Sequence, residues 1–380
     1  MTVLVETPRA DADREPALDY SALLDVLREA SVRTARAGRA DETALRAVRA
    51  CGLLGLAVPV GYGGAGASAA TVNAVLEEVA RVDPSMAVIL FQHFAVSARI
   101  GAWGTPAQQA RLLPRMAAGW VLAASAWSET DAGAAKERLA CTARAGADRS
   151  WTLDGASSLT TGAGIADLYL VLVQTSEAED GSARHGSRGQ TFFLVPADNP
   201  GLTPEPSPAP TGMRGSATGR VSLSGCRVAD GDRLGPVGAA SEIIAGVRET
   251  GATLGAVSAG IARAVLDLTL AHFGRAGLPA GSPRAARLVE LATSVEAVRA
   301  VVADAGRRGS AEPGTTTLHS KLYASQAAEQ IALEASRLLG PVGHVTDHRL
   351  TTLLADARAV TVMGPTNHLC RELIAASLRR

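Results

Sequence analysis

The chain has 380 residues, with 37 Lys and Arg against 37 Asp and Glu, so its formal net charge is zero. Proteins that bind nucleic acid or anionic membrane surfaces favour basic patches, and this balance argues against both kinds of partner. Hydrophobic residues make up 47% of the chain, enough for large cores in two or three domains, but aromatic residues make up only 3%. The cores are therefore expected to consist of Ala, Leu and Val.

The first segment of the chain, residues 1–18, is expected to be a disordered lead-in. It carries acidic side chains and lacks the basic and apolar regions of a signal peptide. No run reaches the roughly 18 consecutive apolar residues of a transmembrane helix. A reduced, cytoplasmic protein with free thiols is expected, because no CxxC pair occurs among the four widely spaced cysteines Cys51, Cys141, Cys226 and Cys370.

Residues 19–120 have helical periodicity and are predicted to form an N-terminal α-helical domain. Ser21 and Asp41 each precede a run with helical spacing, and each can cap a helix. Thr105 is followed by Pro106, which predicts another helix start with a hydroxyl cap and proline at the first helical position.

Residues 121–234 change to short β-like runs separated by Gly, Pro, Ser and Asp. This spacing predicts a small antiparallel β-barrel or sandwich as the middle domain. Residues 181–189 and 200–210 are predicted to be exposed loops. The predicted strands are 121–126, 151–153, 168–173, 191–195 and 220–223.

Residues 235–380 are helical again. Four long helices with short connections predict an antiparallel four-helix bundle. The fold class is therefore α+β, in the order helical domain, β domain, helical bundle. The predicted helices are 241–273, 283–308, 313–339 and 346–379.

Several segments resemble those of flavin-dependent acyl-CoA dehydrogenases. CGLLGLAVPVGYGGAG at 51–66 resembles the family's GLLGLTVPEEYGGAG, and WTLDGASSLTTGAGIADLYLVL at 151–172 resembles YVLNGSKMWITNGGIADIYVVF. Their order and spacing over about 330 residues identify the chain as a member of this superfamily. Other matching segments are VLEEVARVDPSMA at 75–87, GTPAQQARLLPRMAAG at 104–119, RGSATGRVSLSGCRV at 214–228 and LLGPVGHVTDHRLTTLLADAR at 338–358.

The resemblance implies a bound FAD, with its flavin between the β domain and the bundle. Ser128 falls at the hydroxyl of the family's TEP motif, Thr161 on the Thr of WITN near flavin N5, and Thr366 on the Thr of EGT. Reduction builds negative charge on the flavin, which hydroxyl donors stabilise. The alternative is that each hydroxyl bonds only to local turn backbone.

Other cofactor positions depart from the family pattern. Leu159 replaces the Trp that covers the flavin, and Ala134-Ala135 replace a Ser-Asp pair near the pyrophosphate. The segment LAHFG at 270–274 lacks the Arg that reaches the FAD phosphates of a neighbouring subunit, and such losses weaken binding. Arg214 is expected to serve the nucleotide part of FAD. Trp127 is expected either to lie near the substrate or to fill the core.

The family's catalytic base is also missing. ADARAVTVMGPTNHLCR at 355–371 resembles RDAKIYQIYEGTAQIQR, and Gly364 stands in place of its Glu. The Gly364 N–H can still polarise a thioester carbonyl. Some relatives place the base on the helix that opens the bundle, and this position aligns with Thr250, next to Glu249. One residue is about 100° of helix rotation, so Glu249 reaches the site only if the helix start is shifted.

Two residues beside Gly364 are candidates for contact with the substrate. His368 lies one helical turn after Gly364 and could act as a base, or be a partly exposed structural residue. Met363 directly precedes Gly364. His344 and His348 have the i, i+4 spacing of metal ligands, but no metal site is expected there.

The leading functional prediction is an FAD-dependent α,β-dehydrogenation of an acyl thioester, carried by CoA or by an acyl carrier protein. A base removes the α-proton, a hydride passes from the β-carbon to flavin N5, and an electron-transfer flavoprotein or oxygen reoxidises the flavin. One alternative is a monooxygenase that uses reduced flavin and oxygen. Another is a non-redox acyl-binding or isomerising protein that has lost FAD. The resemblance also implies a homodimer or homotetramer.

Overall fold

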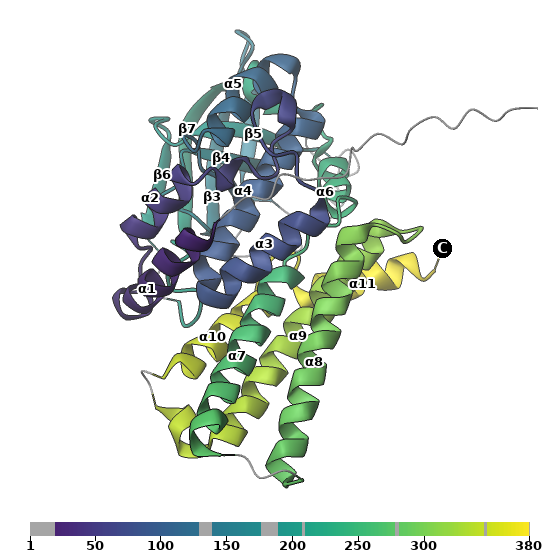
Figure 1. Ribbon diagram of the computed structural model, residues 1–380. Coiled ribbons are helices and arrows are strands. Elements are labelled where there is room, and N and C mark those ends of the chain that lie inside the picture. The colour runs from purple at the N-terminus through teal and green to yellow at the C-terminus, as the bar shows by residue number, and fades with distance from the viewer. Residues whose placement is uncertain are drawn as a thin grey trace, which may run out of the picture.

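The computed structural model describes residues 20–128, 139–175, 189–206, 210–277, 281–345 and 348–379. They form two lobes: helices packed on a β-sheet, and a helical bundle that extends away from them (Figure 1). The predicted order of helical domain, β domain and bundle is confirmed. Three expectations lie outside the described residues: the lead-in at 1–18, Ala134-Ala135 and most of the loop at 181–189.

The N-terminal helices begin largely where local signals place them. The Asp41 carboxylate accepts a hydrogen bond from Ala44 N at 3.0 Å, and Thr105 forms a capping box with Gln108. The prediction for Ser21 is wrong, because the helix already includes Ser21 and has no side-chain cap. The helices are α1 (Ser21–Ala37), α2 (Glu42–Ala50), η1 (Leu53–Gly55), η2 (Val60–Tyr62), α3 (Ala69–Val82), α4 (Pro84–Trp103) and α5 (Pro106–Ala117).

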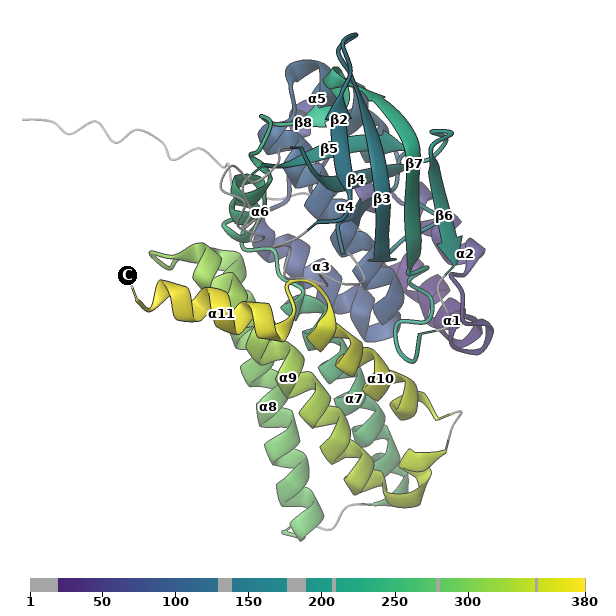
Figure 2. The same ribbon diagram turned by 180° about the vertical axis from the view of Figure 1, so that it is seen from behind.

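Among the described residues, the middle segment forms one eight-stranded sheet. Figure 2 shows most of its strands lying side by side. The strand order is β6-β7-β3-β2-β4-β5-β8, and β1 pairs with β4. Most pairs are antiparallel as predicted, but β1 runs parallel to β4, and one parallel pair joins β2 to β4. The strands are β1 (Ala123–Ala126), β2 (Thr142–Ala145), β3 (Ser150–Thr160), β4 (Leu168–Gln174), β5 (Gln190–Pro196), β6 (Leu202–Pro206), β7 (Gly219–Ala229) and β8 (Arg233–Leu234), with η3 (Asp230–Asp232) before β8.

The prediction of an exposed loop at 200–210 is wrong where β6 forms. Leu202 to Pro206 pair antiparallel with Gly219 to Leu223 of β7. The prolines in this segment suggested a loop. They are tolerated because β6 lies at the edge of the sheet, where one side of the strand needs no ladder hydrogen bonds.

The central strands are buried on both faces. Leu170 and Phe192 face the N-terminal helices, whereas Tyr169 and Phe193 belong to a second cluster on the opposite face. All seven residues of β4 are buried. This continuous burial explains the unbroken apolar run at Leu168–Val173.

Two helices predicted to be continuous are each broken. Helix 241–273 divides into α6 and α7 at Gly251, which has φ of +84°, a conformation that ends a helix. Helix 346–379 divides near Pro365, because proline donates no backbone hydrogen bond and restricts the residue before it. The C-terminal elements are α6 (Ala240–Arg248), α7 (Gly255–Ala276), α8 (Pro283–Arg307), α9 (Pro313–Leu339), η4 (Gly340–His344), α10 (Arg349–Val362) and α11 (Asn367–Ser377).

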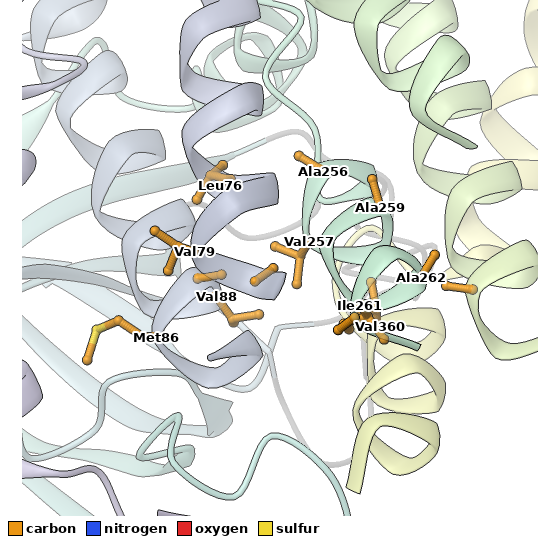
Figure 3. Packing of buried hydrophobic residues seen from close by; sticks show 14 of the residues in the cluster. Leu76, Val79, Met86, Val88, Ala256, Val257, Ala259, Ile261, Ala262 and Val360 are labelled. Atoms are coloured by element: carbon orange, nitrogen blue, oxygen red, sulfur yellow. The ribbon is translucent and has the colours of Figure 1, made fainter. Parts of the chain in front are cut away.

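The main core joins the two lobes. Leu76 and Val79 of α3 pack against Val257 and Ile261 of α7 (Figure 3). A second core joins α4, the sheet and α6. Both cores contain residues from either side of the predicted boundaries at 120 and 234. Packing therefore does not separate the chain at these points, and the boundaries stay predictions.

Two helices, Pro84–Trp103 and Gly255–Arg275, are long and apolar enough to cross a membrane by length and composition alone. However, 67% and 61% of their most apolar windows are buried inside the protein. Core helices have this property, and the two helices contribute to the two cores described above.

Candidate active site

A pocket lies where the two lobes meet. Its volume is about 890 Å³, including the solvent-filled space at its opening. Its walls come from α4, the end of β1, α6, α9 and the turn between α10 and α11. Three residues predicted to belong to the site line it: Trp127, Ser128 and Gly364. They come from positions more than 200 residues apart in the chain, so the tertiary fold assembles this site.

The end of β1 is tied to the end of β3. The Ser128 carbonyl accepts hydrogen bonds from Ser158 N at 2.6 Å and from Ser157 Oγ at 2.9 Å. Leu159, which follows Ser158, is 64% exposed, and Thr161 lies in the turn just after the end of β3. Ser128 therefore lies close to the segment that contains Leu159.

Trp127 lies between the sheet and α4. Its ring packs on Phe192 with 5.5 Å between centroids, and the Arg99 guanidinium lies 4.7 Å from the Trp127 centroid. Trp127 therefore both contributes to the core and lines the pocket.

Gly364 leaves space for a side chain. A Cβ added there would meet no heavy atom within 4 Å. In the described part of the chain, no acceptor is paired with its N–H. This N–H is therefore available to a ligand, and the backbone would accept a larger residue.

Glu249 lies at the break between α6 and α7, one residue past the end of α6. Its carboxylate accepts a hydrogen bond from Gly314 N, at the start of α9, at 3.1 Å. It lines a second cavity, which shares the wall residues Phe91, Ala95, Val247 and Ala252 with the pocket. The helix predicted over 241–273 is interrupted next to Glu249, and the Glu249 carboxylate lies behind the wall that the two cavities share.

Three predicted residues near Gly364 do not line the pocket. Met363 is partly buried against the main core. The His368 side chain is 83% exposed, with Nε2 3.1 Å from a carboxylate oxygen of Glu372. The Thr366 hydroxyl accepts a hydrogen bond from Leu369 N at 3.1 Å and so caps α11. Thr366 therefore has the local role that the sequence analysis left open.

Replacing Thr366 with Ala is expected to lower the free energy of unfolding by about 1 kcal/mol, the usual contribution of an N-cap side chain. Thr366→Ser keeps the accepting oxygen and should restore most of it. Urea denaturation of both variants checks this. A Thr366→Ala protein as stable as wild type, but with weaker flavin binding, would contradict the cap and favour the cofactor role.

Arg214 lies away from the residues that line the pocket. Its guanidinium approaches Gly38 at the end of α1, and its Nε is buried without a partner in the described part of the chain. The loop around it is fixed by two hydrogen bonds, from Met213 N to Asp356 at 2.6 Å and from Gly215 N to Ser85 at 3.1 Å.

Sequence reasoning missed three cationic residues in the pocket wall: Arg99, Arg248 and Lys321. One signal could have revealed the first, because Arg99 is the single Lys, Arg, Asp or Glu in the 20-residue apolar helix α4. Burial lowers the pKa of Lys321 to about 8, and its Nζ donates to Asn367 Oδ1 at 2.6 Å. Nothing in the periodicity of α9 singles Lys321 out.

Three models of known families match the chain. The acyl-CoA dehydrogenase N-terminal domain matches residues 24–120, the middle domain 124–226 and the C-terminal domain 243–379. The chain belongs to the acyl-CoA dehydrogenase family. It is therefore an enzyme of a family of flavoprotein oxidoreductases, whose members bind FAD or FMN.

The similarity covers nearly all of the chain. A probable acyl-CoA dehydrogenase, FadE25 of Mycobacterium tuberculosis, is 30% identical over 90% of this chain and 88% of its own length. An acyl-CoA dehydrogenase of Bacillus subtilis is 29% identical over 86% of this chain and 87% of its own. Butyryl-CoA dehydrogenase from Megasphaera elsdenii superposes with a TM-score of 0.86 over 99% of this chain and all of that one. Its 22% identity shows a shared fold.

Proposed function

We propose that this enzyme uses FAD to oxidise an acyl thioester in the pocket beside Gly364, leaving an α,β-unsaturated acyl group. The observation that carries the proposal is that Trp127 and Ser128 of the β domain and Gly364 of the bundle line one cavity. The thioester carrier, CoA or an acyl carrier protein, belongs to the proposal. So do the electron acceptor, an electron-transfer flavoprotein or oxygen, and a homodimeric or homotetrameric assembly.

The residues at the ends of strands β1 and β3 fit a flavin. Exposed Leu159 presents apolar surface near Ser128, which lines the pocket, and Thr161 follows beyond the end of β3. The Nε of Arg214, buried and without a partner among the described residues, is a donor suited to an oxygen of the nucleotide part. FAD, when bound, accepts the two electrons of the reaction.

The Gly364 N–H is proposed to donate to the thioester carbonyl oxygen. This bond stabilises the negative charge that develops on the oxygen as the α-carbon loses its proton. Because its N–H has no competing acceptor in the described residues, Gly364 can act through its backbone alone.

Glu249 is proposed to take the α-proton. The Gly314 N–H orients its carboxylate, and four small or apolar residues separate the two cavities. The balance is complete: the proton ends on Glu249, the hydride passes from the β-carbon to the oxidant, and the C–H electron pair at the α-carbon forms the double bond. Met363 receives no step because a thioether is not a base, and His368 receives none because its side chain is 83% exposed and paired with Glu372.

The proposal is tested by the absorption spectrum of the FAD-saturated protein, mixed anaerobically with acyl thioesters. We expect the visible flavin band to bleach with thioesters and to remain with CoA alone. A flavin that binds but does not bleach with any thioester contradicts acyl oxidation and favours the oxygen-dependent alternative. Failure to bind FAD contradicts the flavoenzyme proposal itself and favours a non-redox protein.

A further inference from the structure

We propose that the pocket selects an acyl group that carries a carboxylate of its own, and that Arg99 binds this carboxylate. The inference rests on the proposed function, since it takes the occupant of the pocket to be an acyl thioester.

Among the residues that the structure describes, Arg99 is a buried cation without a counter-ion. Only 4% of the residue is exposed, and Nη1 donates one hydrogen bond, to Ala95 O at 3.0 Å. Its Nε is buried without a partner among the described residues. Burial lowers its pKa to about 9, and no carboxylate of a described residue acts in the opposite direction. A buried charge in this condition is strongly unfavourable unless a ligand completes the pair.

Elsewhere in this protein, several partly buried arginines are paired with acids. Arg263 and Arg299 both contact the Glu77 carboxylate at 2.8 Å. Arg49 contacts Asp167, also at 2.8 Å. Arg99 is more deeply buried than any of these and has no such partner in the described part of the chain, so its missing partner is expected to come from outside the protein.

The other charged residues of the pocket wall are also positive. Arg248 and Lys321 also line it, and no Asp or Glu does so among the described residues. Lys321 is already occupied by Asn367 Oδ1 at 2.6 Å and Thr361 O at 3.4 Å. The carboxylate nearest to Arg248 in sequence, Glu249, bonds to Gly314 N. The positive field is therefore shared by three side chains, and Arg99 is the one with an unused buried donor.

Packing against Trp127 does not account for this arrangement. A guanidinium that stacks on an aromatic ring uses its flat face, and its N–H groups remain free in the plane. Those in-plane donors match a carboxylate. Most of the remaining wall is apolar, including Phe91, Ile244 and Leu318, which suits a short methylene chain ending in a carboxylate better than a bulky hydrated phosphate.

The test compares two CoA thioesters of equal carbon number, glutaryl and pentanoyl, by calorimetric titration of the FAD-saturated full-length protein. We expect glutaryl-CoA to bind about tenfold more tightly or better, the effect of one charge-assisted hydrogen-bonded pair. Arg99→Met should remove this preference and Arg99→Lys should retain part of it. Arg46→Met, at an exposed site on α2, is the matched control and should change neither affinity.

Two outcomes overturn the role of Arg99. If Arg99→Met weakens glutaryl-CoA, pentanoyl-CoA and CoA equally, Arg99 meets a phosphate of CoA and not the acyl group. If ligand-free Arg99→Met has a lower thermal midpoint than wild type and the preference persists, Arg99 is structural. The proposal instead predicts an unchanged or higher midpoint for the ligand-free variant, since an unpaired buried charge has been removed.

The same titrations separate this inference from the proposed function. If pentanoyl-CoA bleaches the flavin and binds as tightly as glutaryl-CoA, the carboxylate site is wrong and acyl oxidation stands. If glutaryl-CoA binds with dependence on Arg99 but no thioester bleaches the flavin, the site stands and acyl oxidation is wrong. If neither thioester binds, both are wrong.

Discussion

Glu249→Gln is expected to lower the rate of flavin reduction by an acyl thioester by about 10²- to 10⁴-fold, the usual contribution of a general base. Gln retains a carbonyl oxygen that can accept the hydrogen bond from Gly314 N, so the start of α9 should keep its stability. Stopped-flow reduction under anaerobic conditions measures the rate. The thermal midpoint, expected to stay unchanged, checks the fold.

A double variant sharpens this test. Gly364 lines the pocket and has space for a side chain, so Gly364→Glu places a carboxylate in the cavity without a backbone clash. In the Glu249→Gln background, this second carboxylate should recover part of the lost rate. It also adds an acid near three cations, which is expected to weaken binding of a carboxylated acyl group.

Near-normal reduction by Glu249→Gln would show that Glu249 is not the base. Lys321 would then be the next residue to replace, because it lines the pocket and burial lowers its pKa to about 8. A second variant, Gly314→Ala, changes the position of the Glu249 carboxylate and leaves its charge unchanged. An added Cβ would lie 2.2 Å from its Oε1, so the carboxylate must move.

Asp356→Asn is expected to stabilise the protein by about 2–3 kcal/mol at pH 7. Asp356 is almost fully buried, and burial raises its pKa to about 6, against an ordinary value of 3.8. Between about pH 4 and 6 the folded protein therefore holds a proton that the unfolded chain has released. The free energy of unfolding falls as the pH rises through this window, by about 1.4 kcal/mol for each pH unit between the two pKa values. Asn cannot ionise and can still accept from Met213 N.

Urea denaturation of wild type and Asp356→Asn across pH 4 to 7.5 provides the measurement. The difference in unfolding free energy should be small near pH 4, grow through pH 6 and then level off. Buried His93, whose pKa is lowered by burial to about 4, titrates with the opposite sign, but it is common to both proteins and cancels in the difference. A difference that does not change with pH would show that Asp356 has no raised pKa.

Much of this protein could be predicted from local patterns. Helix starts at Asp41 and Thr105 follow from a side-chain acceptor and a neighbouring backbone N–H, both within four residues. Strands β4 and β5 follow from short apolar runs between turn residues. The matches to known segments place the chain in its family, and Trp127, Ser128 and Gly364 all line one pocket.

The same patterns predicted one helix over 241–273, because periodicity contains no information on how closely distant segments approach one another. At Gly251, where the helix is interrupted, an added Cβ would lie 2.4 Å from Ala305 O, so only glycine fits against a residue more than fifty positions away. The break in turn directs the Glu249 carboxylate to Gly314 N on α9. Edge strand β6 was missed for a related reason, since its prolines are acceptable only at a sheet edge.

The sequence by itself determined the family, the order of the three parts of the fold and most helix starts, because these depend on periodicity and on contacts between near neighbours. Only the tertiary structure decided which charges are buried and which of them have partners. Arg99 is one residue in an apolar helix until the fold buries it against Trp127, away from every described carboxylate. Burial and pairing depend on long-range packing, and in this enzyme they determine what the pocket is expected to bind.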